Sequence, residues 1–221
     1  MTELMPPLIT GLGVTLQLTL GGAALGIVAA LIGGLLRLSL IRPVRWLAAA
    51  YIEVFRGTSA LVQLFWFYFV LPLFGVSLDA TTVGILVLGL NAGAYGAEVV
   101  RGAIQAVPKG QSEAAVSLNL SRWNTMRRII LPQAVPAMLP PAGNLLIELL
   151  KNTALVSLIT ITDLTFSAQI LRAETLKTTE IFSLVLLMYF GAAMVIALMM
   201  RLLERWLARS QGRVVRLQER V

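Results

Sequence analysis

The sequence predicts an all-α integral membrane protein with five transmembrane helices, an N-terminus outside the cell and a C-terminus in the cytoplasm. Three observations support this fold class. The 221-residue chain is 57% hydrophobic and 13% charged, whereas a typical soluble domain is about 25% charged. Five long windows contain no charged residue. The Lys and Arg residues gather between alternate windows and at the C-terminus.

Each uncharged window can cross the hydrocarbon core of a bilayer, which takes about 17–25 helical residues. The windows are residues 4–36, 57–78, 80–97, 129–147 and 181–200. With their flanks, they predict helices at about 11–36, 57–78, 80–100, 134–155 and 181–203. The shorter stretch 152–162 is expected to be re-entrant or interfacial. The first window is too long for a signal peptide and lacks its basic flank, so we expect that it is not cleaved.

The distribution of basic residues sets the expected orientation, because Lys and Arg are enriched in cytoplasmic loops. Of the 18 basic residues, 15 follow the first helix, the third helix or the last helix, which places them on one side of the membrane. Lys151, Arg172 and Lys177 fall on the other side. The net charge of +7 therefore has a membrane explanation. Nucleic-acid binding, which needs a basic reading face, is disfavoured.

Missing residue types exclude several chemistries. The chain has no Cys and no His, so it forms no disulfide, zinc finger or Ser-His-Asp triad. A mean hydropathy of +0.83 excludes intrinsic disorder. The P-loop pattern GxxxxGK[ST] is absent, since Lys109, Lys151 and Lys177 do not follow a glycine. We expect no catalytic residue, metal site or cofactor in this chain, so any ATP would be bound by another subunit.

The third predicted helix has two unlike faces. Asn91, Tyr95 and Glu98 are spaced i, i+4, i+7 and share one face. Gly89 and Gly93 lie on the opposite face as a GxxxG pair, which allows close packing of another helix. The polar face is expected to line a route for a polar solute. The alternative is that Asn91 and Tyr95 only hydrogen-bond a neighbouring helix.

The fourth predicted helix repeats the polar spacing with Asn144, Glu148 and Lys151, followed by Asn152 and Thr153. Ionisable groups at membrane depth usually face one another or a water-filled path. We therefore include Asn144, Glu148 and Lys151 in the expected substrate pathway. The alternative is an ion pair between Glu148 and Lys151. Three prolines are expected to disturb the start of this helix: Pro136, Pro140 and Pro141.

The loop 101–133 between these helices is expected to form two short helical segments on the cytoplasmic side. Ser112 is expected to cap a helix that begins at Glu113, and Ser121 to cap a second one. Asn119 tolerates the left-handed conformation and would turn the chain between them. Trp123 and its neighbours on one helical face suggest a docking element for a cytoplasmic partner. A solvated interfacial hairpin is the alternative.

This loop resembles the EAA loop of ABC importer permeases. The family pattern is Glu-Ala-Ala, three residues, Gly, nine residues, Ile, any residue, Leu and Pro. The matching residues are Glu113, Ala114, Ala115, Asn119, Ile129, Leu131 and Pro132, with Asn119 in place of the usual glycine. Further stretches, 51–58, 90–95, 104–111 and 151–156, are similar to the polar amino acid permeases of the histidine and glutamine type. The resemblance covers about residues 11–205.

The resemblance implies a type-1 permease domain at 11–205, between an extracytoplasmic segment 1–10 and a basic cytoplasmic tail 206–221. Family members work in the bacterial cytoplasmic membrane as homodimers or heterodimers. The EAA segment is a coupling helix that docks in a groove of the ATP-binding subunit, which holds ATP and Mg²⁺. An extracytoplasmic solute-binding protein delivers the solute. We expect a polar amino acid or a zwitterionic solute such as ectoine, and alternating access driven by the ATPases.

Other transport classes remain as alternatives. A stand-alone ion-coupled secondary transporter would need no ATP, and its sequence would contain inverted repeats, of which we see none. For a channel or exporter subunit, adding a binding protein and ATP would not change the flux of solute. An intramembrane enzyme would depend on Glu148 and Lys151, because the chain offers no His or Cys.

Overall fold

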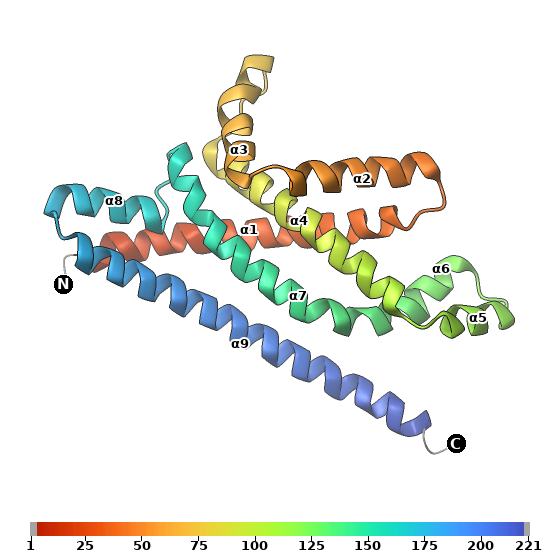
Figure 1. Ribbon diagram of the computed structural model, residues 1–221. Helices are drawn as coiled ribbons and strands as arrows, with labels where there is room; N and C mark the ends of the chain where they lie inside the picture. Colours follow the sequence, from red (N-terminus) through yellow and green to blue (C-terminus); the bar gives the residue numbers. More distant parts are fainter. Residues whose placement is uncertain (1–3, 219–221) are drawn as a thin grey trace.

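The computed structural model describes residues 4–218, with side chains through residue 207, and this part of the chain contains helices but no strand. Four long helices extend along the molecule (Figure 1): α1 (Met5–Arg37), α4 (Ala80–Ala106), α7 (Leu131–Asn152) and α9 (Thr178–Gln218). The short helices α5 (Lys109–Ser117) and α6 (Arg122–Thr125) lie at one end, and α8 (Leu164–Thr175) lies at the other. Residues 1–3 and 219–221, and the side chains of the predicted tail from residue 208 on, lie outside the described part.

Helices α1 and α4 form the most extensive helix pair of the described chain. Glycines on the facing sides of both helices let the two backbones approach. A Cβ on Gly34 would lie 2.7 Å from Cβ of Val100, and a Cβ on Gly89 would lie 2.9 Å from the carbonyl oxygen of Gly22. The predicted packing face of Gly89 and Gly93 is confirmed, because small residues remove the side chains that would separate the helices.

The predicted second span is not one straight helix. Helix α2 (Arg42–Gly57) is followed by α3 (Ala60–Phe65), a π-helical segment (Trp66–Val70) and a 3-10 segment (Leu71–Phe74). The stretch Ala60–Phe74 turns away from α2 by 104° and projects from the body of the molecule (Figure 1). The helix predicted at 57–78 is therefore shorter in the structure: the helical stretch begins at Ala60 and ends at Phe74.

Four helical stretches of the described chain are long and apolar enough to cross a membrane: Met5–Arg37, Ala80–Ala106, Arg122–Ile159 and Thr178–Leu207. The bent pair Arg42–Gly57 and Ala60–Phe74 makes a fifth if it counts as one span. The structure thus allows four or five spans, where the sequence predicted five.

Helix α7 runs without interruption through Pro136, Pro140 and Pro141. The disturbance expected there lies earlier, in a π-helical turn at Met126–Ile130. A proline ring pushes against the carbonyl of the residue four positions before it, and for Pro132 that carbonyl falls inside the wider π turn. The predicted interfacial stretch after α7 is a 3-10 helix (Thr153–Ile159) with buried Val156 and Ile159.

The far end of the molecule is anchored by a buried carboxylate. The Asp163 side chain is fully buried and caps α8 by accepting a hydrogen bond from the backbone N–H of Phe166 at 2.9 Å. The hydroxyl of Tyr189 in α9 donates to its other oxygen at 3.4 Å. Thr15 in α1 accepts from the backbone N–H of Leu164 at 3.2 Å. These bonds tie α1, α8 and α9 together.

Candidate functional site

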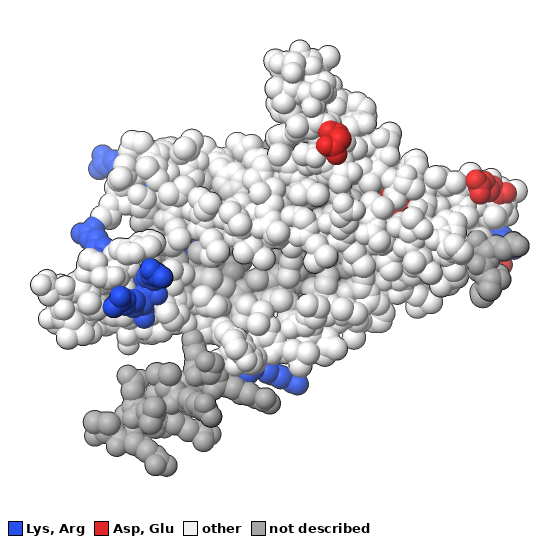
Figure 2. Space-filling model, turned by 180° about the vertical axis from the view of Figure 1, so that it is seen from behind, with Lys and Arg blue, Asp and Glu red and all other residues white. Residues whose placement is uncertain are grey.

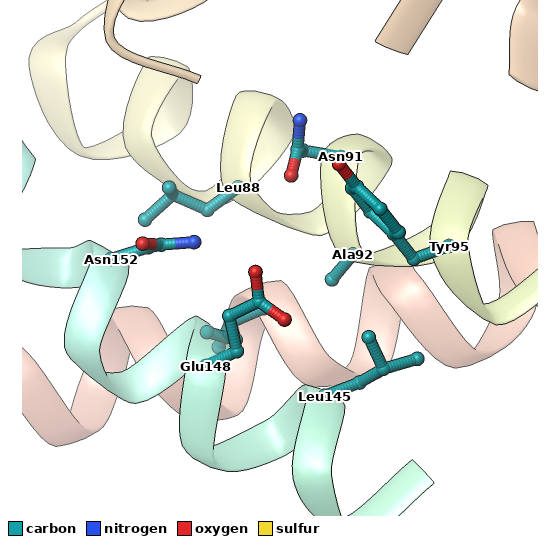
Figure 3. A pocket seen from close by; sticks show the side chains of 8 residues that line it. Leu88, Asn91, Ala92, Tyr95, Leu145, Glu148 and Asn152 are labelled. Carbon is teal, nitrogen blue, oxygen red and sulfur yellow. The ribbon is translucent and has the colours of Figure 1, made fainter. Parts of the chain in front are cut away.

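Helices α4 and α7 enclose a small polar cavity (Figure 3). It is lined by Leu88, Asn91, Ala92, Tyr95, Leu145, Glu148, Leu149 and Asn152. The carboxylate of Glu148 and the amide of Asn152 reach from α7 toward α4. The structure therefore brings the predicted residues Asn91, Tyr95 and Glu148 to one place, although they are up to 57 positions apart in the sequence.

The cavity is closed in this conformation. Its volume is about 10 Å³, close to the least space that holds one water molecule. A solute larger than one water molecule does not fit in this cavity as it stands. The geometry therefore represents a compact state of the site.

Asn91 and Tyr95 also hold the end of α2, as the alternative interpretation predicted. The Asn91 amide donates to the carbonyl of Phe55 at 2.9 Å and to the side-chain oxygen of Gln63 at 3.3 Å. The Tyr95 hydroxyl donates to the carbonyl of Arg56 at 3.5 Å, and the Arg56 guanidinium lies 5.2 Å from the centre of the Tyr95 ring. Both side chains thus line the cavity and brace its wall.

Glu98, the third residue of the predicted polar face, does not line the cavity. Its carboxylate forms a salt bridge with Arg101 at 2.6 Å, one turn further along α4. Arg101 also donates to Gln105 at 2.8 Å. The polar side chains of α4 therefore continue from the cavity toward the end that carries α5. Beyond the cavity they bond to one another: Glu98 to Arg101, and Arg101 to Gln105.

Glu148 has no hydrogen bond or ion pair within residues 4–207. The alternative ion pair with Lys151 is absent from that part of the chain, and the Lys151 side chain is exposed. Neither Lys151 nor Asn144 lines the cavity. At about 100° per residue, the face of α7 formed by Leu145, Glu148 and Asn152 points to α4, while positions 144 and 151 lie about a quarter-turn away.

Sequence reasoning missed Gln63 and Tyr51. The amide of Gln63 donates to the carbonyl of Phe55 at 2.9 Å and to the hydroxyl of Thr58 at 2.7 Å. The Tyr51 hydroxyl donates to the carbonyl of Leu90 in α4 at 2.8 Å. Gln63 could have been found as the lone amide in an otherwise apolar window, because a polar group at membrane depth needs a partner.

The hairpin 107–130 joins the two helices that line the cavity. Helix α5 begins at Lys109, directly after Pro108, and Ser112 makes no capping bond. This corrects the predicted start at Glu113: the N–H of Gln111 already donates to the carbonyl of Pro108 at 3.0 Å, so the helical turn starts earlier. The predicted Ser121 cap is confirmed, since its hydroxyl accepts from the N–H of Asn124 at 3.3 Å.

Asn119 ends α5 in the left-handed conformation, with φ of 53°, as predicted. The N–H of Leu120 donates to the carbonyl of Ala115 at 3.0 Å, and the N–H of Asn119 to that of Val116 at 2.9 Å. This bond pattern is a Schellman motif, in which the residue in the left-handed conformation is usually glycine. Asn119 therefore supplies the turn geometry expected of the glycine it replaces.

The hairpin exposes several large apolar side chains among polar and charged ones. Of the EAA residues, Ala115 is fully buried, while Glu113 and Ala114 are exposed. Val116, Leu118 and Trp123 are 73%, 72% and 67% exposed. Ile129 and Leu131 are half-buried at the start of α7, beside the exposed Pro132. Large apolar side chains gathered on one exposed element mark an interaction surface.

Residues 22–209 match the family described as binding-protein-dependent transport system inner membrane component. The chain belongs to this family. It is 47% identical over 216 residues to a probable amino-acid ABC transporter permease protein, y4tF, of Sinorhizobium fredii, covering 95% of this chain and 91% of the relative. It is 38% identical over 203 residues to the glutamine transport system permease protein GlnP of Escherichia coli K12, covering 91% and 93%.

The fold has a solved counterpart. A crystal structure of an amino acid ABC transporter with histidines superposes with a TM-score of 0.86 at 40% identity, covering 93% of this chain and 96% of the other. The predicted resemblance to amino acid ABC importer permeases, and the type-1 permease fold, are confirmed. The comparisons give no support to a stand-alone secondary transporter or channel.

Proposed function

We propose that this permease subunit carries a polar amino acid, or a related zwitterionic solute, through the cavity between α4 and α7. The observation that supports this most is the convergence of Asn91, Tyr95, Glu148 and Asn152 on one cavity between two helices that are long and apolar enough to span a membrane. Amides and a phenol offer hydrogen bonds to a polar solute. The carboxylate of Glu148, which has no partner among the side chains of residues 4–207, matches an ammonium or guanidinium group.

The hairpin couples this cavity to ATP. Helix α4 leads into α5, and the π-helical segment that α5 contacts continues into α7. A displacement of α5 by an ATP-binding subunit would therefore reach both walls of the cavity. Closure of two such subunits would drive alternating access, with a solute-binding protein delivering solute on the outer side and a second permease chain, identical or homologous, completing the pathway.

The topology we propose is an N-terminus outside, a C-terminus in the cytoplasm and the α5–α6 end at the cytoplasmic surface of a bacterial inner membrane. The permease domain would extend over residues 11–205. The absence of native cysteines makes this topology accessible to single-cysteine labelling with a membrane-impermeant maleimide.

Glu148→Gln tests the substrate contact. In the complete importer reconstituted in liposomes, we expect a raised KM for a cationic or zwitterionic amino acid, because the charge-assisted bond is lost. Glu53→Gln is the matched control, since Glu53 is exposed on α2 and does not line the cavity. Equal uptake kinetics of the two variants would refute the assignment.

Val116→Cys tests the coupling surface. We expect this exposed hairpin position to crosslink to the ATP-binding subunit in the assembled complex. Leu40→Cys, which is 72% exposed in the turn between α1 and α2, is the control and should crosslink much less. Failure of Val116→Cys to reach any ATP-hydrolysing subunit would remove the coupling role.

A further inference from the structure

A second cavity lies behind the polar one and is far larger. It occupies about 330 Å³ between α1, α4, α7 and α9, and all 18 residues that line it are apolar or glycine. Ile27 and Leu31 on α1 line it while being 57% and 40% exposed, so its mouth opens on the surface. It is therefore an open groove within the membrane-spanning part of the protein.

The groove and the polar cavity share a wall. Ala92, Leu145 and Leu149 line both. The polar groups of Asn91 and Glu148 stand on one side of the layer formed by α4 and α7, and α1 covers the other side (Figure 3). A solute pathway needs the polar side, which a second permease chain would complete. The groove side is therefore left to the bilayer.

The charges around the groove favour an anionic headgroup. Arg201 and Arg205 are exposed and flank the groove residues Met200 and Leu203 on α9, where Glu204 is the acidic neighbour. Arg127 and Arg128 are exposed just before α7. Seen from behind, the broad middle of the molecule shows no Lys or Arg, and these residues gather mainly toward the end that carries α5 and α6 (Figure 2). Basic residues at the cytoplasmic ends of spans attract anionic lipids.

We infer that one acyl chain of an anionic phospholipid fills the groove between α1, α4, α7 and α9, with its headgroup at the arginine-rich end. An empty apolar groove of this size loses the dispersion contacts of every residue along its walls, and a lipid tail restores them. Because the tail would pack against Ala92, Leu145 and Leu149, it also supports the wall of the polar cavity.

Lipid retention tests the inference independently of transport. The assembled complex is equilibrated in nanodiscs of equal phosphatidylglycerol and phosphatidylcholine, then washed in detergent, and its bound lipid is counted by native mass spectrometry. We expect one retained phosphatidylglycerol per permease chain. Ala23→Phe and Ala142→Phe place a ring in the groove and should abolish most of this retention. Ala24→Phe is the matched control, because Ala24 is exposed and does not line the groove.

Three outcomes would overturn the inference. The first is a wild-type complex that retains no lipid, or retains the two lipids in the ratio of the bilayer. The second is equal retention in Ala142→Phe, Ala23→Phe and Ala24→Phe. The third is efficient disulfide formation between two permease chains carrying Ile27→Cys, because this would place a second copy over the mouth of the groove. The lipid-retention and crosslinking measurements do not depend on the substrate contact. Their results would be the same whether or not Glu148→Gln loses substrate uptake.

Discussion

The α1–α4 interface makes a quantitative prediction at Gly93. A Cβ at this position would lie 2.6 Å from Cβ of Ala29, 3.0 Å from the hydroxyl of Tyr51 and 3.1 Å from the carbonyl oxygen of Gly26. Non-bonded carbons prefer about 3.5–4.0 Å, so Gly93→Ala forces α1 and α4 apart by about 1 Å. Overpacking of this kind costs about 1–3 kcal/mol.

The same substitution at Gly102 provides the control. Gly102 is in the same helix, and a Cβ there would meet nothing within 4 Å. Gly102→Ala should stabilise α4 by about 1 kcal/mol, because alanine favours the helix. The two variants should therefore differ by about 2–4 kcal/mol. Thermal unfolding of the complex in nanodiscs should show a lower midpoint for Gly93→Ala and an equal or higher midpoint for Gly102→Ala.

A second substitution checks the cause. Ala29→Gly removes the atom that a Cβ at Gly93 would strike, so the double variant should recover part of the lost stability. Recovery should be incomplete, because the contacts with Tyr51 and Gly26 remain. Gly93→Ala should also slow uptake, since Asn91 lies two residues away. If Gly93→Ala and Gly102→Ala unfold together, the close-packing argument is refuted.

Three further predictions concern other parts of the fold. Burial raises the pKa of Asp163, so the folded state binds a proton more readily than the unfolded state, and the free energy of unfolding should rise as the pH falls through the raised pKa. Asp163→Asn, which keeps the cap, should flatten that dependence in unfolding experiments between neutral and acidic pH. Asn119→Gly should raise stability by about 1 kcal/mol, because glycine adopts positive φ without strain, and a lower unfolding midpoint would contradict this. Gln63→Leu leaves the carbonyl of Phe55 with one donor fewer and should cost about 1–3 kcal/mol, whereas the exposed Gln105→Leu should cost less.

Four of the five predicted spans, and the shared face of Asn91 and Tyr95, could be predicted because they depend on local periodicity. The i, i+4 spacing of Asn91 and Tyr95 predicts that they share one helix face, and in the structure both line the cavity. Asn119 and Ser121 act as their side-chain chemistry predicts. Each of these expectations needs only the residue and its neighbours within two turns.

The bend between α2 and α3 could not be predicted, because its stabilising partners come from elsewhere in the chain. The carbonyl of Phe55 near the end of α2 accepts from Gln63 and from Asn91, which is 36 residues away in the sequence. Within the uncharged window 57–78, Gln63 signals that a polar partner is needed, but nothing in the window identifies that partner or the bend. For the same reason, the sequence placed Glu148 and Lys151 together in the expected pathway, whereas the orientation of α7 against α4 brings only Glu148 to the cavity.

On the proposed function, the two faces of α4 would let one helix serve both packing and transport. Its glycines bring α1 so close that the helices cannot shift independently, while its amide and phenol hold α2 and line the cavity. Helix α7 lacks such a locked partner on its polar side, and Glu148 is unpaired within the described side chains. A force applied at α5 should therefore move α7 relative to a rigid unit of α1, α2 and α4. On this proposal, opening of the cavity would consist mainly of a displacement of Glu148 and Asn152 away from Asn91 and Tyr95.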